Sequence, residues 1–275
     1  MKDFKDKVVV ITGAGSGIGR ATAMAFASEG AKLHITDINQ GRVEAVADEI
    51  KAMGAEAMPY VVDSADRKAM KKFAEDVFTS AGRVDILHNN AGIATGCAID
   101  KTPLEDWEKV INVNLWGVIY GIHFFLPRMI AQGGGHIVNT SSGAGLTGLP
   151  TLAPYAATKF AVVGISEVMN IELRRHGIYT TALCPGIIST NIVRDSKIDI
   201  FNKKGECMKD STVRFYAKRG APPERVAKDV LRAIRKKRPV QPSPYHAYHL
   251  WIIKRISVRL YQALARLIMR IVGVK

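Results

Sequence analysis

The stretch that decides the fold is Val8-Val9-Val10-Ile11-Thr12-Gly13-Ala14-Gly15-Ser16-Gly17-Ile18-Gly19. Its first four residues are a short apolar run, which predicts a buried strand, and apolar residues at helical spacing predict a helix over 17–29. Three glycines, at 13, 17 and 19, allow a tight turn and a close approach of the backbone to a ligand. A helix that starts at such a turn offers free N–H groups and a positive dipole end, which suit a pyrophosphate.

The same alternation of strand and helix continues along the chain. Strands are predicted at residues 7–11, 32–36, 57–62, 84–88, 136–140 and 178–183. Helices are predicted at residues 17–29, 40–53, 66–81, 103–131 and 154–176. Strands joined by helices of crossover length predict an α/β fold, with a single Rossmann-like, doubly wound parallel sheet and helices on both faces.

Composition narrows the class of protein. The chain has 275 residues and three cysteines, none at CxxC spacing, so neither a disulfide framework nor a zinc site is expected, and the histidines show no metal-ligand spacing. A reducing, cytoplasmic setting is the expectation. The sequence starts without a signal-peptide pattern and has no run of about 18 apolar residues, so no membrane-spanning helix is expected.

Charge is distributed unevenly. The net charge is +14, but residues 201–275 hold 19 Lys/Arg and 4 Asp/Glu, which is 19 − 4 = +15. Such an imbalance indicates either a solvated basic face or a surface for an anionic partner. No recognition motif accompanies the arginines, so nucleic acid is not the expected partner.

Asp37 follows the second predicted strand, 24 residues after Gly13. An acid about 20 residues after a glycine turn of this kind binds the ribose of a dinucleotide, although a helix N-cap or a turn is an alternative role for Asp37. A carboxylate here accepts hydrogen bonds from ribose hydroxyls and repels a 2′-phosphate, which favours NAD over NADP. Arg42 is the one nearby cation that weakens this inference.

Tyr155 and Lys159 lie four residues apart near the start of the predicted helix 154–176, so their side chains share one face. A neighbouring ammonium group favours the phenolate and lowers the pKa of a tyrosine, which is one way to build a general acid/base. The alternative is an ordinary amphipathic helix with a surface Tyr and Lys, and the pair by itself does not decide between them.

Taken jointly, the motifs resemble those of the short-chain dehydrogenase/reductase family. The matching residues are Thr12-Gly13-xxx-Gly17-x-Gly19, Asn89-Asn90-Ala91-Gly92, Asn114, Ser142 thirteen residues before Tyr155, Tyr155-xxx-Lys159 and Pro185-Gly186. They occur in the family's order and spacing over residues 7–190. The resemblance implies an NAD(H)-dependent oxidoreductase that interconverts a secondary alcohol and a carbonyl compound.

The resemblance also implies roles for individual residues. Tyr155 would exchange a proton with the substrate oxygen, Lys159 would lower the pKa of Tyr155 and hold the nicotinamide ribose, and Ser142 would hydrogen-bond the substrate oxygen. Asn114 would hold a water that links Lys159 to solvent, and Asp63 would contact the adenine. The implied cofactor-binding residues are Thr12, Gly13, Ser16, Gly17, Ile18, Gly19, Asp37, Asp63, Asn90, Ala91, Gly92, Tyr155, Lys159, Pro185, Gly186, Ile188 and Thr190.

These expectations set the domain boundaries. Residues 1–220 would form the dinucleotide-binding and catalytic domain, with the polar, Lys-rich stretch 187–220 as a loop over the substrate. Residues 221–275 would form a basic, helical C-terminal extension of the same domain. The uncharged segment 143–152 after Ser142 predicts a lipophilic alcohol or ketone as substrate. An anionic head group stays open because the loop also contains Arg194, Lys197, Lys203 and Lys204.

Residues 250–272 carry an amphipathic pattern. An apolar stripe is formed by Ile253, Ile256, Leu260, Leu264, Leu267 and Ile271, and Arg255, Arg259, Arg266 and Arg270 fall on another face. The pattern fits a helix on an anionic membrane surface, with Trp251 and Tyr261 at the interface, and fits equally a helix packed on its own protein or a sister subunit.

The expected partners are a small-molecule alcohol or ketone and further copies of the chain. The resemblance implies a homodimer or homotetramer built through helices 103–131 and 154–176. A cytoplasmic location is expected, with association to a membrane left open. Two alternative functions remain at this point: an NADP-dependent carbonyl reductase, and a non-catalytic NAD-sensing protein that docks on membranes.

Overall fold

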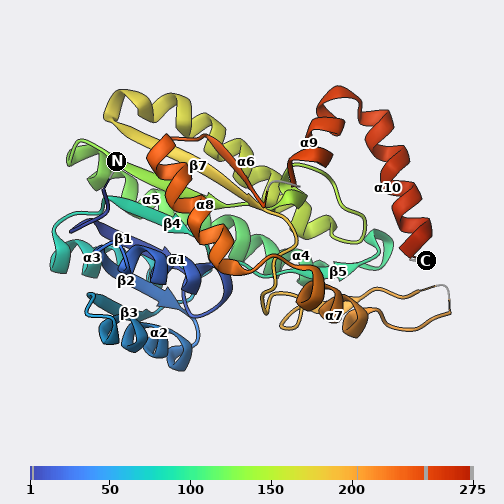
Figure 1. Ribbon diagram of the computed structural model, residues 1–275, viewed down its shortest axis with the longest axis horizontal. Coiled ribbons are helices and arrows are strands. Elements are labelled where there is room, and N and C mark those ends of the chain that lie inside the picture. Colours follow the sequence, from blue (N-terminus) through green and yellow to red (C-terminus); the bar gives the residue numbers. More distant parts are fainter. Residues whose placement is uncertain (2, 203, 245–246, 273–275) are drawn as a thin grey trace.

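A parallel sheet of seven strands forms the centre of the computed structural model, which describes residues 1, 3–202, 204–244 and 247–272 (Figure 1). In spatial order the strands are β3 (Ala57–Val61), β2 (Lys32–Asp37), β1 (Val8–Thr12), β4 (Ile86–Asn89), β6 (Gly135–Thr140), β7 (Ile178–Pro185) and β9 (Val240–Ser243). The chain winds outward from β1 to β3 and then returns to the other side of β1 to form β4. This reversal between β1 and β4 is a topological switch point, and in open α/β sheets ligands bind at the carboxyl ends of the strands there.

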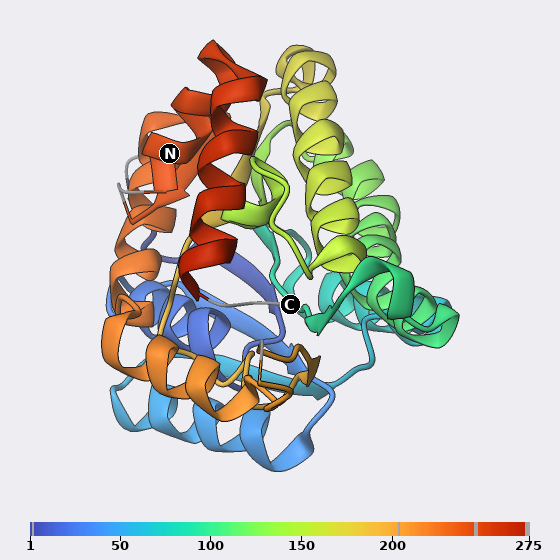
Figure 2. The ribbon, with the colours of Figure 1, turned by 90° about the vertical axis from the view of Figure 1, so that its right-hand side faces the viewer.

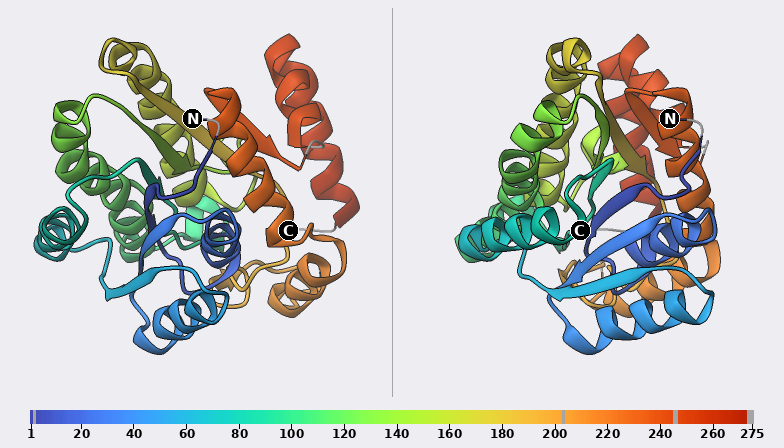
Figure 3. Two further views of the ribbon diagram at one scale, coloured as in Figure 1. Left: turned by 60° about the vertical axis from the view of Figure 1, so that its left-hand side comes forward. Right: turned by 90° about the vertical axis from the view of Figure 1, so that its left-hand side faces the viewer.

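Helices cover both faces of the sheet (Figure 3). They are α1 (Gly17–Ala27), α2 (Gln40–Ala52), α3 (Arg67–Ala81), α4 (Leu104–Ile111), α5 (Gly117–Ala131), α6 (Ala153–Glu172) and α8 (Pro223–Lys236). Alternate residues of β1 point to opposite faces, so Val9 and Ile11 enter a core with α1, α2 and α8. Val8 and Val10 enter a second core with α3 and α5. The Rossmann-like fold predicted from the alternation of strands and helices is thereby confirmed.

Residues 187–243 depart from the expectation of a loop followed by a helical extension. The stretch 187–220 contains β8 (Lys197–Asp199), which pairs with β5 (Thr95–Cys97), and α7 (Lys209–Arg219). Beyond it, α8 packs on α1, and β9 is the seventh strand of the sheet. Residues 223–243 therefore complete the sheet domain, and the region outside it starts only after β9. Strand β9 was not predicted from the sequence, because Val-Gln-Pro-Ser shows neither an alternation of apolar and polar residues nor a long apolar run.

The segment Leu104–Ala131 is a single helical run that passes through a π-helical turn at Asn112–Trp116. By length and composition alone this run is apolar enough to cross a membrane, a candidate that the search for a continuous run of about 18 apolar residues had not found. Phe125 and Met129 of this run are fully buried in the second core. The run therefore covers the sheet, and its π turn lies beside the site.

The C-terminal region is a hairpin of two helices, α9 (Ala247–Ile256) and α10 (Val258–Val272), and not the one continuous helix expected over 250–272. The hydroxyl of Ser257 accepts a hydrogen bond from the backbone N–H of Leu260, which caps α10 and separates it from α9. Figures 1 and 2 show the hairpin, in red, standing beside α6 on the side of the molecule where α7 and β5 also lie.

Two aromatic residues expected at an interface instead anchor the hairpin. Trp251 packs on the small apolar cluster around Leu146, and Tyr261 is buried. The hydroxyl of Tyr261 donates a hydrogen bond to the carbonyl of Gly148, and Lys254 donates one of 3.1 Å to the carbonyl of Leu146. The hairpin is thus tied to the segment that follows Ser142.

Candidate active site

The turn between β1 and α1 lets a ligand approach the protein backbone closely, because its glycines carry no side chains and leave no space for them. Gly13 and Gly17 adopt φ values of +63° and +53°, which favour glycine. A Cβ atom on Gly19 would lie 2.1 Å from the carbonyl oxygen of Gly13. Ser16 precedes α1 without capping it through its side chain, so the first N–H groups of α1 remain for an anion. This cradle fits the pyrophosphate of a dinucleotide.

Thr12 and Asn90 join the carboxyl ends of β1 and β4. The hydroxyl of Thr12 accepts the backbone N–H groups of Asn90 at 3.0 Å and of Ala91 at 3.1 Å. In return, the side-chain amide of Asn90 donates to the carbonyls of Thr12 and Gly13. Four hydrogen bonds therefore fix the two strands at the switch point, where the fold predicts a ligand.

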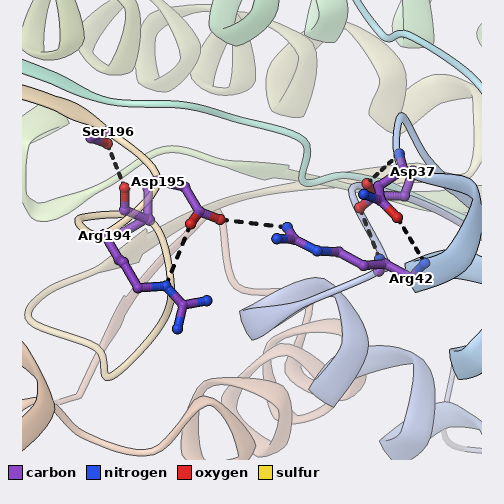
Figure 4. A network of polar contacts seen from close by, with 8 residues as sticks. Asp37, Arg42, Arg194, Asp195 and Ser196 are labelled. Carbon is purple, nitrogen blue, oxygen red and sulfur yellow. Dashed lines mark hydrogen bonds and ion pairs between the residues drawn. The ribbon is translucent and has the colours of Figure 1, made fainter.

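The carboxylate of Asp37 stands against the glycine turn (Figure 4). One oxygen accepts the N–H of Gly15 at 3.0 Å, and the other accepts the N–H of Asn39 at 3.0 Å. Arg42 lies close by, but its guanidinium group forms an ion pair of 3.5 Å with Asp195, a residue of the segment that follows β7. The site thus places a carboxylate where a ribose is expected and pairs the nearby cation with a different acid.

Ser142, Tyr155 and Lys159 come together where β6 and α6 meet. Lys159 is buried and donates a hydrogen bond of 2.8 Å to the carbonyl of Thr140, and its ammonium nitrogen lies 5.5 Å from the ring centroid of Tyr155. The hydroxyl of Ser141 points into α6 and donates to the carbonyl of Lys159. The hydroxyl of Ser142 instead accepts the N–H of Ala144, so the two neighbouring serines have different partners.

Burial dominates the protonation of this group. It raises the pKa of Tyr155 to about 12, while the hydrogen bond from Ser142 acts in the opposite direction. Burial likewise lowers the pKa of Lys159 to about 8. The change for Tyr155 is opposite to the one expected from a neighbouring ammonium group, because removing the phenolate from water outweighs the other influences. At neutral pH the phenol therefore keeps its proton.

Asn114 lies in the π-helical turn and is fully buried. Its side chain accepts the N–H of Ile93 at 2.8 Å and donates to the carbonyl of Ile93 at 2.9 Å. A Cβ atom on Gly92 would lie 3.2 Å from the Asn114 oxygen and 3.4 Å from the Lys159 nitrogen. Gly92, Asn114 and Lys159 therefore converge, and π turns often mark functional sites in helices.

The other predicted residues divide into two groups. Thr190 reaches the glycine turn, since a Cβ atom on Gly17 would lie 3.2 Å from its methyl group. Ile188 is buried and forms a β-bridge with Ala221. Pro185 ends β7, and Gly186 donates its N–H to Ser243. By contrast, Asp63 is exposed and accepts the N–H of Ala65, which is a turn contact and gives no sign of its predicted role at the adenine.

Two residues near the site were missed from the sequence. Tyr216 of α7 lies near enough to Tyr155 that its phenol helps to raise the pKa of Tyr155. Asp195 pairs with Arg42, as described above. Neither belongs to a motif, and the polar stretch that contains them had no helical signal strong enough to predict α7. Within the described residues, no group of three or more His, Cys, Asp or Glu side chains is arranged to hold a metal ion.

Comparisons with known proteins agree with this geometry. Residues 7–200 match the family model described as short chain dehydrogenase. The chain is 40% identical, over 96% of its own length, to "Probable oxidoreductase EphD" of Mycobacterium tuberculosis, but it spans only 45% of that protein. It is 37% identical to "Cyclohexanol dehydrogenase" of Acinetobacter sp., over 70% of this chain and 77% of that one.

Solved structures give the same result. A short chain dehydrogenase/reductase from Burkholderia phymatum in complex with NAD superimposes with a TM-score of 0.86 at 31% identity, covering 94% of this chain and 96% of the other. An NAD+-bound xylitol dehydrogenase superimposes with a TM-score of 0.75 at 26% identity, covering 88% of this chain and 99% of the other.

Proposed function

The chain belongs to the short-chain dehydrogenase/reductase family, whose members are NAD(P)-dependent oxidoreductases acting on CH–OH groups, and we propose that it interconverts a lipophilic secondary alcohol and its ketone with NAD(H). The observation that carries the proposal is the group formed by half-buried Ser142 and Tyr155 and buried Lys159, beside a glycine cradle with its carboxylate. All of the proposed site residues lie within residues 1–220.

Each side chain of the group has a task in the proposed reaction. When bound, the dinucleotide supplies or accepts the hydride. Tyr155 donates its phenolic proton to the carbonyl oxygen in the reducing direction and takes it back in the oxidising direction. Ser142 hydrogen-bonds the same oxygen, and Lys159 binds the nicotinamide ribose. Asn114, through its contacts with residue 93, holds the loop that carries Gly92 against Lys159.

The two directions make different demands on Tyr155. A phenol with a pKa of about 12 is ready to act as a proton donor at neutral pH. Alcohol oxidation requires the phenolate, which the ammonium form of Lys159 stabilises only below the Lys159 pKa of about 8. The proton is thus present on the phenol for the reducing direction, and in the oxidising direction the phenol must first lose it.

Asp37 supports NAD as the cofactor, because a carboxylate hydrogen-bonds the ribose hydroxyls and repels a 2′-phosphate. The alternative, an NADP-dependent carbonyl reductase, requires a free cation at this position. Arg42 is the nearby candidate, and its ion pair with Asp195 argues against that use.

The wall next to Ser142 supports a lipophilic substrate. Residues 143–152 contain no charged side chain, and Leu146 is buried among apolar neighbours. "Cyclohexanol dehydrogenase" among the relatives is named for a lipophilic secondary alcohol.

Steady-state rates on a panel of lipophilic secondary alcohols and ketones test the proposal, with NAD(H) and NADP(H) compared by nicotinamide absorbance. We expect turnover with several members of the panel and a kcat/KM at least about tenfold higher with NAD(H). Ser142→Ala serves as the inactive reference protein. Tight NAD binding without turnover on any compound would instead support the alternative of a non-catalytic NAD sensor.

We also propose a homodimer or homotetramer built through α5 and α6. Trp116, Val168 and Ile171 are large apolar side chains that remain exposed on this part of the molecule, and Ile171 is 78% exposed. Apolar exposure of this kind is typical of an interface between subunits. Light scattering of the wild type and of Ile171→Glu tests it: the variant should shift toward the monomer, and a monomeric wild type would refute the proposal.

A further inference from the structure

The apolar stripe of the C-terminal hairpin points away from the protein. Leu260 and Leu267 are 51% and 53% exposed, and Ile256, at the turn of the hairpin, is 78% exposed. Leu260, Leu264 and Leu267 lie on one side of α10, because steps of three and four residues return to the same face. Tyr261, on another side of α10, packs inward. An amphipathic helix normally buries its apolar side, so this one requires a partner outside the chain.

Positive charge borders the same face. Residues 247–272 contain five Lys/Arg and no Asp or Glu. Arg259 and Arg266 are exposed, and among the described residues neither forms an ion pair with an acidic side chain. Arg255 lies 5.2 Å from the ring centroid of Trp251, also without an acidic partner in the described part of the chain. The face therefore combines exposed leucines with uncompensated arginines.

Charge decides which partner fits. A second copy that paired through the same face would bring Arg259 and Arg266 of both chains together, and residues 247–272 supply no carboxylate to neutralise them. An anionic lipid surface supplies phosphate groups for the arginines and acyl chains for the leucines. We propose that the hairpin of α9 and α10 docks on an anionic phospholipid membrane through Ile256, Leu260 and Leu267.

Docking would place the substrate side of the enzyme at the membrane. The hairpin is tied to the segment after Ser142 through Tyr261 and Lys254. Between α10 and that segment runs a groove of about 750 Å³, whose lining includes the apolar Pro150, Phe160 and Val258 and the cationic Lys254 and Arg266. A lipophilic substrate dissolved in the bilayer would then need to travel only along this side of the protein.

Flotation with vesicles tests the proposal, using full-length protein and vesicles of phosphatidylcholine with or without phosphatidylglycerol. We expect the wild type to bind only the vesicles that contain phosphatidylglycerol, and to bind them more weakly as salt is raised. Arg259→Gln/Arg266→Gln should weaken binding about thirtyfold at low salt. Lys101→Gln/Lys109→Gln removes the same net charge elsewhere on the surface and should bind nearly as the wild type does.

A second pair of variants tests the apolar contribution. Leu260→Gln/Leu267→Gln should abolish flotation, whereas Met53→Gln/Met58→Gln, at side chains of similar exposure, should leave it unchanged. Thermal unfolding confirms that each variant is folded. The proposal would be overturned if the wild type does not float with the vesicles, or if the Leu260/Leu267 variant floats as well as the Met53/Met58 variant. It would also be overturned if the Leu260/Leu267 variant loses self-association and the wild type binds no vesicles, because a second copy then covers the face.

Discussion

The glycine turn after β1 and the hairpin of α9 and α10 are both built to meet a partner, but they differ in what fixes them. The backbone of the turn is fixed by atoms of this chain, through the four hydrogen bonds between Thr12, Asn90 and their neighbours, and only the first N–H groups of α1 remain for a ligand. The outer face of the hairpin touches nothing in the described structure that accounts for its leucines. The glycine motif could be interpreted in one way from the sequence, because its contacts lie within the chain. The amphipathic spacing of the hairpin fitted several structures, because the group that covers its leucines lies outside the chain.

Gly19→Ala should produce the largest effect on folding and on dinucleotide binding, because it disturbs the turn itself. The new Cβ atom would lie 2.1 Å from a backbone oxygen, so the turn must move. We expect a loss of about 3 kcal/mol in the free energy of unfolding and a fall of about 100-fold in dinucleotide affinity. Calorimetric titration measures the affinity.

Gly164→Ala is the matched control, because a Cβ atom there has no neighbour within 4 Å and also lies in a helix. It should be neutral or stabilise by about 1 kcal/mol. If the two variants bind the dinucleotide equally, the close-packed turn is not what creates the cradle.

Acid should weaken the sheet domain through its buried histidines. Burial lowers the pKa of His88 to about 3, below the ordinary value of 6.5. Between pH 6.5 and 3 the unfolded chain therefore binds a proton that the folded chain does not, and stability falls as pH falls through this window. His88 should cost about 2 kcal/mol of unfolding free energy at pH 5 relative to pH 7.

Urea unfolding of the wild type and of His88→Gln at pH 7 and pH 5 measures this cost. The variant should lose about 2 kcal/mol less than the wild type on acidification. Equal losses would show that His88 does not carry the acid sensitivity.

Asp37→Ala tests the cofactor preference. Losing the carboxylate should weaken NAD binding about tenfold and narrow the gap between NAD and NADP. Asp48→Ala, which removes the same charge from an exposed position on α2, should change neither affinity. An unchanged ratio of the two affinities in the Asp37 variant would leave the NAD preference without its proposed cause.

Tyr261→Phe should give the smallest effect and tests how the hairpin is attached to the rest of the protein. It removes one hydrogen bond, to Gly148, and about 1 kcal/mol of the attachment between hairpin and body. Trypsin cleavage within residues 254–266 should then become about fivefold faster. Tyr179→Phe, which removes a hydrogen bond to Lys237 elsewhere, should leave that rate unchanged. No acceleration in Tyr261→Phe would mean that other contacts hold the hairpin.

Features set by local sequence patterns could be predicted, and features set by distant contacts could not. Strands β1 to β7, apart from the short β5, follow from apolar runs, and the order of motifs brought Ser142, Tyr155 and Lys159 to one place. The sequence did not reveal β9, because its contacts with β7 depend on distant residues. The neighbouring lysine predicted a lowered pKa for Tyr155, whereas burial raises it, and the burial of one side chain cannot be seen in a local pattern. The break at Ser257 was missed because the apolar spacing runs on through it.

In the proposed reaction the phenol of Tyr155 exchanges a proton with the substrate oxygen. Tyr155→Phe removes only its hydroxyl group, and NADH binding and turnover of the best ketone substrate are to be measured on the same preparation. We expect an NADH affinity within about twofold of that of the wild type and a kcat lower by about 10³-fold. Turnover at the wild-type rate in a variant that binds NADH normally would contradict it.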